Sequence, residues 1–526
     1  MNLLLDKWLP VVRQDGLEDT IAFYEITDDF KNPVVDIKAP RPDFTSAIYQ
    51  LLIGVLQVMI EPKDNEEWEE LWKAPPNVKE IYEKLLPYES CFIINNPEGP
   101  AFMQDYDWKA MQSAKEVQVS NLLINAPGEN AYKENRDHFI KRGFMKTLQP
   151  YWAAIALYTL QSFSPSGGQG IRVGLRGGGP LTVIALPQEY DIRSSLWKKL
   201  WLNVLSRESF RTLINGDHTK SELSDIFPWM AETRTSKNDE LTTPMDVNPK
   251  QMYFGMPRRV RLQFEVSTCP CDLTSTTSPY SVRNYRSVNK GVNYGGPWRH
   301  ALSSYVKDSK NPENPPNPKK GSPEGISYRY WPDISISSEP YIIPANIKDL
   351  ENEEKEKALV SESLEAVMWV CGYDMDNAKT RNWYDKTIPT FILPPAQQIR
   401  ILDYSIQMIS GAELMSRVLK KAIKNSWYKE KATVRGNLGV FGNEFWEATE
   451  DFFYGCLREL VIDFDAYPAI FEKWQKVLIH TAEEIFERVV LSAPLDGSNM
   501  KRVIGARKVL QNGIWKLKKS YKNLIV

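Results

Sequence analysis

Glycine is concentrated in the stretch SFSPSGGQGIRVGLRGGGP, residues 162–180, which holds seven of the 28 glycines in the chain. A backbone without side chains allows close approach of another molecule, and its N–H groups can bind phosphate oxygens or a base edge. Arg172 and Arg176 add positive charge. The stretch therefore predicts either a contact with a phosphate-bearing partner or, with equal weight, tight turns before the strand-like run at 181–186.

The residue types that usually perform catalysis are not arranged for it. The glycines fit neither G-x-x-x-x-G-K-[ST] nor a G-x-G-x-x-G that opens a helix after a strand, so a nucleotide-cofactor site is not expected. None of the four histidines stands in H-E-x-x-H, and no serine occupies a nucleophile elbow. Most carboxylates lie in helical charge runs, where solvation is the default. The sequence predicts no catalytic set.

Cys269 and Cys271 are the one close pair of candidate metal ligands. A structural zinc site needs four ligands, and neither Cys371 nor His300 is near in sequence. We therefore expect no zinc and no other cofactor. Five cysteines, an odd and scattered number, favour a reducing compartment.

Two basic regions could meet a polyanion. Residues 501–526 carry eight Lys or Arg and no Asp or Glu, with Lys508, Lys518 and Lys519 as candidate backbone contacts. A solvated helix end that complements the macrodipole is the alternative. Residues 281–300 interleave Arg286 and Lys290 with aromatic side chains, which suits base or phosphate contact, although a hairpin explains the pattern nearly as well.

The candidate residues lie in two regions with different patterns of secondary structure. Residues 1–394 mix strand and helix patterns, including a buried helix over 44–60, strands at 258–266 and 327–336, and a mobile surface insertion over 309–325. Residues 395–526 read as four amphipathic helices. The apolar faces predicted for those helices comprise Leu402, Ile406 and Ile409; Phe445, Thr449, Phe452, Cys456 and Leu460; Ile470, Trp474, Val477, Thr481, Ile485 and Val489; and Val503, Leu510, Ile514 and Leu517.

Length and charge set further bounds. A chain of 526 residues exceeds one core, and 42% hydrophobic residues indicate a folded protein. The net charge of −2 means that any nucleic-acid contact depends on local patches. The first residues do not form a signal peptide, and residues 44–60 are too short and too polar for a membrane span, so we expect a cytoplasmic protein without a membrane partner.

Several motifs together resemble one family. MNLLLDKWLPV, PRPDFTSAIYQLLIGVLQVM, GPAFMQD, LLINAPG and above all SGGQGIRVGLRGGGPLTVIAL followed by DIRSSLWKKLWLNVL are similar to the CasA family, the large subunit of the type I-E CRISPR surveillance complex Cascade. The resemblance extends over nearly the whole chain and is loose over residues 216–357. It implies an α+β fold, with a large mixed α/β domain followed by a C-terminal four-helix bundle.

The resemblance also implies a non-catalytic DNA-recognition subunit. Its expected partners are the other Cascade subunits and guide RNA, double-stranded target DNA, and a nuclease-helicase recruited on target binding. The implied sites are a loop that reads the protospacer-adjacent motif at Ser166, Gly167, Gly168, Gln169 and Gly170; a strand-separating wedge at Asn377 and Ala378; a minor-groove cation at Lys290 or Arg286; and a guide-handle loop at Leu123, Ile124 and Asn125.

Two other classes remain as alternatives. A nucleotide-dependent enzyme would use the glycine stretch to bind phosphates, and a structural scaffold would use it only for turns. Specificity in guide-directed assemblies is delegated to base pairing, so a nearly neutral body with a few contact sites is sufficient for the DNA-recognition role.

Overall fold

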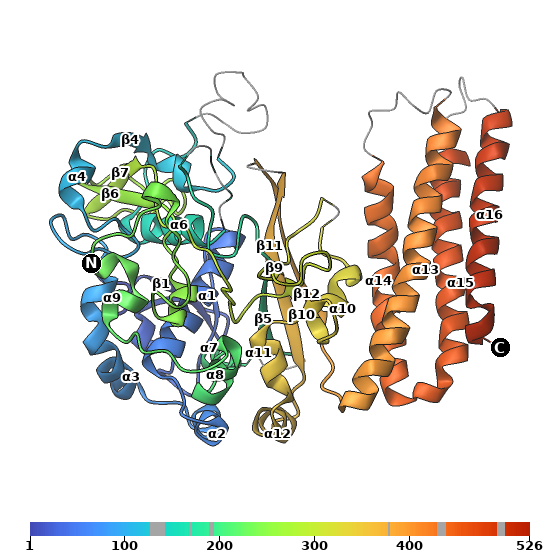
Figure 1. Ribbon diagram of the computed structural model, residues 1–526, viewed down its shortest axis with the longest axis horizontal. Coiled ribbons are helices and arrows are strands. Elements are labelled where there is room, and N and C mark those ends of the chain that lie inside the picture. Colours follow the sequence, from blue (N-terminus) through green and yellow to red (C-terminus); the bar gives the residue numbers. More distant parts are fainter. Residues whose placement is uncertain are drawn as a thin grey trace. The chain divides into compact units, whose positions relative to one another are not determined.

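The chain forms two compact units in the computed structural model, which describes residues 1–126, 143–163, 165, 167, 170–188, 194–323, 325–376, 379–428, 438–491 and 500–525. The first unit comprises Met1–Pro323 and Ser337–Thr390. The second comprises Glu324–Ile336 and Phe391–Val526. Figure 1 shows the elements of each unit coloured along the sequence.

Two buried helices lie at the centre of the first unit. Helix α1 (Pro42–Met59) has proline at its first position, where the missing N–H costs nothing, and Asp43 in its first turn. Nearly all of its side chains are buried, and it packs against α6 (Pro150–Phe163), which is buried almost as completely. This confirms the buried helix predicted over 44–60. Among the described residues, no helix is both long enough and apolar enough to span a bilayer.

The described strands form four antiparallel sheets of three strands each, in the orders β2-β1-β3, β10-β8-β9, β12-β11-β5 and β4-β7-β6. The longest pairing joins β11 and β12, with Cys371 opposite Asp385, and β5 pairs with the other edge of β11. The strands are β1 (Leu9–Arg13), β2 (Glu18–Ile21), β3 (Val34–Ile37), β4 (Lys115–Gln118), β5 (Thr182–Pro187), β6 (Arg259–Val266), β7 (Tyr280–Val288), β8 (Tyr305–Val306), β9 (Asn317–Pro318), β10 (Tyr341–Ile342), β11 (Ala366–Asp376) and β12 (Lys379–Pro389).

Tryptophans join the smaller helices of this unit. Trp68 and Trp201 each donate an indole N–H to the backbone carbonyl of the other, at 3.2 and 3.0 Å. Both rings are fully buried, so their polar edges are satisfied without water. The remaining α-helices of the unit are α2 (Asn65–Lys73), α3 (Val78–Leu85), α4 (Trp108–Gln112), α7 (Leu196–Trp201), α8 (Arg207–Ile214), α9 (Leu223–Ile226), α11 (Ala345–Lys348) and α12 (Glu353–Ser361).

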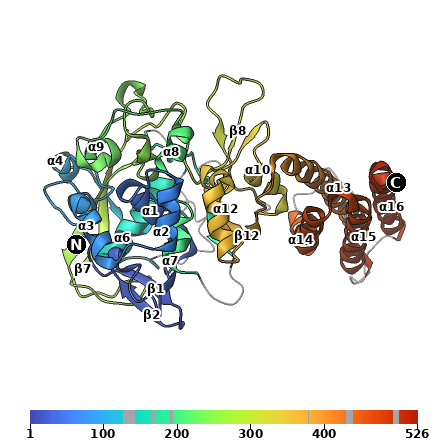
Figure 2. The ribbon, with the colours of Figure 1, turned by 90° about the horizontal axis from the view of Figure 1, so that it is seen from below.

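Four long helices make up most of the second unit: α13 (Pro395–Trp427), α14 (Gly439–Ile462), α15 (Tyr467–Phe486) and α16 (Met500–Ile525). Figure 2 looks nearly along their axes and shows them packed side by side. Helix α13 contacts the other three helices. Gly411 of α13 allows the closest approach to α16, since a Cβ there would lie 2.0 Å from the hydroxyl of Tyr521.

A mid-chain segment completes the core of the second unit. Residues 327–336 were predicted as a strand, which is wrong: they form the 3-10 helix η7 (Tyr328–Tyr330) and α10 (Trp331–Ser335). The Tyr328 ring stacks on Phe453 with centroids 4.4 Å apart, and its hydroxyl lies 2.9 Å from Thr449 Oγ1. Alternating aromatic residues are compatible with a strand, but here they fill the bundle.

The predicted apolar faces of the long helices agree with the observed burial to different extents. All four residues predicted for α16 are buried. The predicted α14 face is correct except at Phe452, which is half exposed, while its neighbour Phe453 is buried. The predicted α13 face is wrong at Ile406, which is exposed, whereas Ile409 is buried and Leu402 is half-buried. The buried line of α13 also includes Ile401, Met408, Ala412 and Met415.

Candidate nucleic-acid interface

The two described glycines of the predicted motif-reading loop reach the surface. Gly167 is exposed, and Gly170 is half-buried with a φ of +77°, a conformation that favours glycine. Ser166, Gly168 and Gln169 lie outside the described residues. A Cβ at Gly167 would lie 2.9 Å from Cγ2 of Ile171, so a substitution there requires the Ile171 side chain to shift.

Downstream, the same glycine-rich stretch is packed tightly. A Cβ at Gly178 would lie 2.6 Å from Cα of Pro165, and one at Gly179 would lie 2.6 Å from the carbonyl oxygen of Tyr373 on β11. Gly179 also has a φ of +64°. These glycines allow the chain to pass between its neighbours, so this half of the stretch is structural.

Lys290 lies directly beside the loop. Its backbone N–H donates to the carbonyl of Gly170 at 2.7 Å, and its side chain is exposed. Its φ of +64° is uncommon for lysine, so the surrounding contacts hold it in this conformation. Two residues about 120 positions apart in the sequence are thereby brought together.

Arg286, the alternative cation, has other partners. It lies on β7, where its guanidinium donates to the carbonyl of Ala114 at 2.8 Å and to Glu116 at 3.4 Å. Arg172 lies nearer the loop, and its Nε donates to Ser236 Oγ at 2.8 Å. Lys290 is therefore the better-placed cation of the two candidates.

Arg176 cannot contact a partner directly, because it is 3% exposed. Its guanidinium donates to Thr182 Oγ1 at 3.0 Å, to Ser303 Oγ at 2.9 Å and to the amide oxygen of Gln50. Burial lowers the pKa of this guanidinium. The sequence-based interpretation of Arg176 as available surface charge is wrong.

Arg258 braces the other end of the stretch. It donates to the carbonyl of Pro165 at 2.6 Å, and burial lowers its pKa to about 10. No described carboxylate forms an ion pair with Arg258 or Arg176, and Arg258 Nε has no partner in the described part of the chain. The glycine stretch is thus braced by two cations with neutral acceptors, Arg176 within it and Arg258 beside Pro165.

Lys320 is a candidate that the sequence analysis missed. It was assigned to a mobile surface insertion, yet β9 pairs with β8 and Lys320 forms a β-bridge with Pro180. Its exposed Nζ lies 3.4 Å from where a Cβ of Gly177 would be. The sequence signal for this contact was only the pair Lys319-Lys320 at the end of the proline-rich run.

The predicted guide-handle loop touches the hairpin of β11 and β12. Thr380 on β12 donates to the carbonyl of Ile124 at 3.1 Å, and Arg41 donates to the side chain of Asn125 at 3.1 Å. Leu123 is buried, whereas Asn125 is exposed. Asn377 and Ala378, the predicted wedge, lie outside the described residues, between the ends of these two strands.

The strand ends beside the predicted wedge are fixed by charge. Arg381 donates to both carboxylate oxygens of Asp374 at 2.7 Å. The Asp374 side chain is 2% exposed, so its charge depends on this partner. This ion pair therefore joins the two strands where their register shifts, between Asp374 and Met375, close to the end of the hairpin.

In the second unit, Lys508, Lys518 and Lys519 are exposed on α16, and none of them forms an ion pair with a described residue. Their predicted contact with a nucleic-acid backbone stays a prediction. They belong to a different compact unit from the glycine stretch.

Cys269 and Cys271 do not belong to a metal cluster in the part of the chain that the structure describes, where no three His, Cys, Asp or Glu side chains converge. Cys271 is buried, and Cys269 accepts from Arg283 at 3.0 Å. Hydrogen bonds from Ser267 and Arg283 lower the pKa of the Cys269 thiol.

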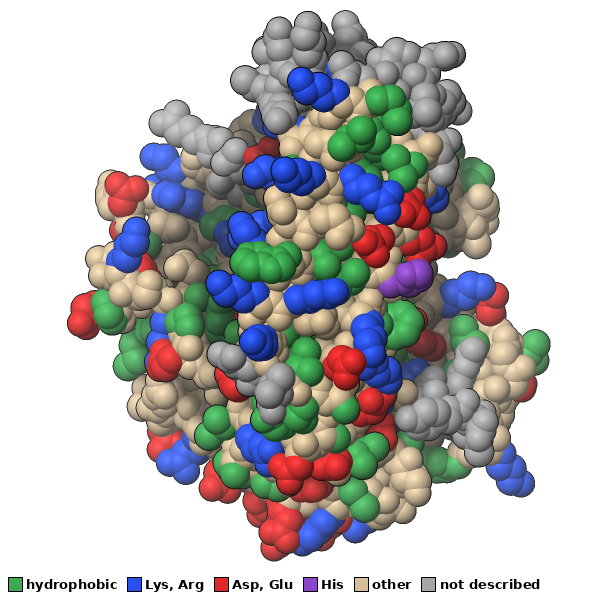
Figure 3. All heavy atoms as spheres, turned by 90° about the vertical axis from the view of Figure 1, so that its right-hand side faces the viewer, with side chains coloured by type: hydrophobic (Ala, Val, Ile, Leu, Met, Phe, Trp, Pro, Cys, Tyr) green, Lys and Arg blue, Asp and Glu red, His purple; other side chains and the backbone are tan. Residues whose placement is uncertain are grey.

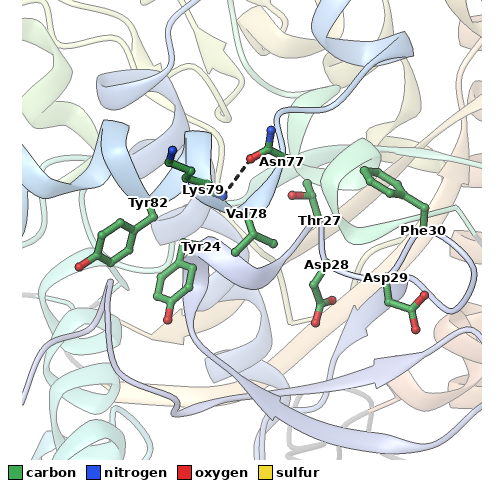
Figure 4. A pocket seen from close by; sticks show the side chains of 9 residues that line it. All are labelled: Tyr24, Thr27, Asp28, Asp29, Phe30, Asn77, Val78, Lys79 and Tyr82. Atoms are coloured by element: carbon green, nitrogen blue, oxygen red, sulfur yellow. Dashed lines mark hydrogen bonds between the residues drawn. The ribbon is translucent and has the colours of Figure 1, made fainter.

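A cavity of about 600 Å³ in the first unit is a poor phosphate site. Figure 4 shows Tyr24 and Tyr82 at one end and Asp28 and Asp29 at the other. Lys79 is the one cation that lines it. The two carboxylates would repel a nucleotide here, and no residue of the glycine stretch lines this cavity.

Comparisons with known proteins agree on one fold. A family model described as CRISPR-associated protein Cse1 matches residues 2–485. CasA of Thermus thermophilus is 17% identical with a TM-score of 0.70, covering 98% of this chain and 99% of that one. Cse1 of Thermobifida fusca is 15% identical with a TM-score of 0.67, covering 99% and 97%. A chain of a CRISPR RNA-guided surveillance complex is 15% identical with a TM-score of 0.65, covering 98% and 99%. The predicted fold class is confirmed.

Proposed function

Because the chain belongs to the Cse1 family of CRISPR-associated proteins, we propose that it recognises target DNA as the large subunit of a guide-RNA surveillance complex. It reads the protospacer-adjacent motif in duplex DNA, helps to open the duplex for pairing with the guide, and offers a docking surface to a nuclease-helicase. It performs no catalysis itself, and it works in the cytoplasm with the other Cascade subunits and the guide RNA.

The observation that carries this proposal is the junction of Gly170 and Lys290. Gly167 is exposed, Gly170 is bonded to the backbone of the exposed Lys290, and Lys320 lies beside Gly177 of the same glycine-rich stretch. The minor groove presents acceptor groups and a strongly negative potential, and its narrow floor excludes bulky side chains. Bare backbone flanked by lysines matches both properties.

The hairpin supports the opening step. The described strand ends, Asp376 of β11 and Lys379 of β12, come directly before and after the predicted wedge residues Asn377 and Ala378 in the sequence, and Asp374 and Arg381 form an ion pair close to these ends. The contact of Thr380 with Ile124 links this hairpin to the predicted guide-handle loop. A rigid strand pair that touches the guide-binding loop is suited to separate base pairs where guide pairing begins.

The decisive experiment changes Gly167 to aspartate in the reconstituted complex. A carboxylate there would face DNA phosphates and widen the loop, so we expect affinity for motif-containing duplex to fall at least about tenfold. Gel-shift titration against duplexes with and without the motif measures this. Unchanged affinity would contradict the proposal and favour the scaffold alternative.

Gly455→Asp on α14 is the matched control, because a Cβ there meets no atom within 4 Å. It introduces the same charge at a site remote in sequence from the glycine stretch, and we expect motif binding to stay as in the parent. The enzyme alternative is tested separately: ATP or GTP that raised the melting temperature of the chain would support it.

A further inference from the structure

Helix α16 carries an exposed tryptophan within a row of unpaired lysines. Trp515 is 61% exposed, although most tryptophans of this chain are buried. Lys508, Lys518, Lys519 and Lys522 stand at −7, +3, +4 and +7 from it, which places all of them on its side of the helix. None of these four lysines forms an ion pair with a described residue, and α16 contains no acidic residue.

Other side chains of α16 contact the neighbouring helices of the bundle. Val503, Leu510 and Leu517 are buried against the bundle. Arg507 pairs with Glu487 at 3.3 Å, and Gln511 donates to Glu483 at 2.9 Å, so this edge of the helix is attached to its neighbours. Gln511 lies one turn before Trp515 on the same side of the helix, so this attached edge borders the exposed face that carries Trp515 and the four lysines.

Neither a solvated helix end nor a generic polyanion surface accounts for Trp515. Lysines in the last turns of a helix complement its macrodipole, but Lys508 lies near the middle of α16 and an exposed indole contributes nothing to that effect. Lys519 Nζ lies 5.3 Å from the centroid of the Trp515 ring, so the indole is already flanked by positive charge. Figure 3 faces the side of this unit where α16 lies and shows Lys and Arg side chains with hydrophobic side chains exposed among them.

We propose that this face of α16 binds an unpaired nucleic-acid strand, with one base stacked on Trp515 and the phosphates held by Lys508, Lys518, Lys519 and Lys522. Aromatic platforms within a basic track are how proteins hold single strands without reading sequence. A duplex could engage the lysines, but its stacked bases have no free face for the indole. From Lys508 to Lys522 the row spans roughly 21 Å, which allows a few nucleotides to lie along it.

The DNA strand displaced when a duplex opens is the ligand of this chemistry, an assignment that rests on the proposed function. Unpaired RNA presents the same phosphates and base faces, so the test includes both. The site itself needs only the second unit, because every residue that forms it lies on α16.

Fluorescence anisotropy of the full chain with a labelled oligothymidylate of about 15 nucleotides at low salt tests the proposal. We expect Trp515→Ala to weaken binding about tenfold, the size typical of one lost stacked base, and Trp515→Phe to retain most of the affinity. Lys519→Gln should lower affinity and reduce the salt dependence by about one ion. A 5-iodouracil oligonucleotide should crosslink to residue 515, and a duplex of equal length should compete poorly.

Phe452→Ala on α14 is the control, since this ring is also half exposed but has no row of lysines around it. The result that overturns the proposal is a Trp515→Ala chain that folds normally and binds the oligonucleotide like the parent. Competition by duplex as strong as that by single strand would also overturn the proposal. Tighter binding of an oligouridylate than of the oligothymidylate would overturn the assignment of the ligand as DNA. If Trp515→Ala impaired only assembly with partner subunits, the residue would be a protein contact and the proposal wrong.

The two hypotheses fail separately. Gly167→Asp should leave oligothymidylate binding unchanged, because it lies in the other unit. Gly167→Asp is therefore expected to lose motif recognition and keep strand binding, and Trp515→Ala to lose strand binding and keep motif recognition. A variant that departs from its expected result identifies which of the two hypotheses is incorrect.

Discussion

Lys290 and Arg286, the two candidate minor-groove cations, differ in the partners that they have within the protein. Lys290 is exposed beside Gly170, whereas Arg286 bonds with Ala114 and Glu116 across the β4–β7–β6 sheet. An arginine already held by a carboxylate has less to gain from a phosphate than a lysine that forms no ion pair with a described residue.

We expect Lys290→Gln to weaken binding of the reconstituted complex to motif-containing duplex by about three- to tenfold and to lower the salt slope by about one. Arg286→Gln should stay within about twofold of the parent. Gel-shift titrations over a series of salt concentrations measure both. The opposite ranking would transfer the minor-groove role to Arg286.

Arg176 shows how a surface loop can depend on a buried charge. Its guanidinium donates to Gln50 on α1, to Thr182 on β5 and to Ser303. The planar guanidinium can bond to these three acceptors at once. The Phe163 ring lies 5.4 Å from its Cζ, which further compensates the charge.

Arg176→Met should reduce the free energy of unfolding of the chain by about 2–4 kcal/mol, because it leaves buried acceptors without donors. Arg176→Lys should recover part of the loss, since an ammonium can reach some of the same acceptors. Urea unfolding followed by circular dichroism gives the comparison. Equal stability of the methionine variant and the parent would show that the three acceptors find other partners.

At the scale of elements, the β11–β12 hairpin is the part whose rigidity the proposed opening step requires. Arg381→Leu leaves the carboxylate of Asp374 buried without its cation, so we expect a loss of about 2 kcal/mol, since Arg381 is partly exposed. The end of the hairpin should fray as a result. Permanganate footprinting should show less strand opening at the target, while docking on motif-containing duplex stays close to the parent.

The double variant Asp374→Asn with Arg381→Leu tests the cause. It removes both charges, so stability and opening should return toward the parent values. If opening stayed normal in Arg381→Leu despite the lost stability, the hairpin would not be the opening element.

How far the sequence predicts these elements depends on whether local pattern or distant packing decides them. The buried helix α1 and the buried line of α16 follow from apolar periodicity and were predicted correctly. The helical conformation at Tyr328 was not predicted, because the aromatic residues around it alternate as in a strand. Its actual partners, Phe453 and Thr449, lie more than 100 residues away in the sequence. Lys320 was missed for the same reason: nothing nearby in the chain indicates Gly177 as its neighbour. The glycine stretch itself was found from composition, but only contacts separate its exposed half from its packed half.

At the scale of the molecule, the chain enters the second unit twice. Residues 324–336 leave the first unit and return to it at Ser337, before the chain leaves again at Phe391. Tyr328 and Trp331 are both fully buried, and their rings meet Trp446, Phe453, Trp474 and Phe391 of the second unit. A fragment ending at Thr390 would therefore carry two large aromatic side chains without the rings that cover them.

We expect a fragment of residues 1–390 to self-associate and to bind the dye ANS, since an uncovered aromatic patch on a protein surface promotes association. The same fragment with residues 324–336 replaced by a glycine-serine linker should be monodisperse, because the strands and helices of the first unit have their own core. Size-exclusion chromatography with light scattering compares the two. Aggregation of both fragments would mean that the first unit depends on the bundle for more than the cover of Tyr328 and Trp331, and monodisperse behaviour of the unmodified fragment would mean that the segment finds cover within the first unit.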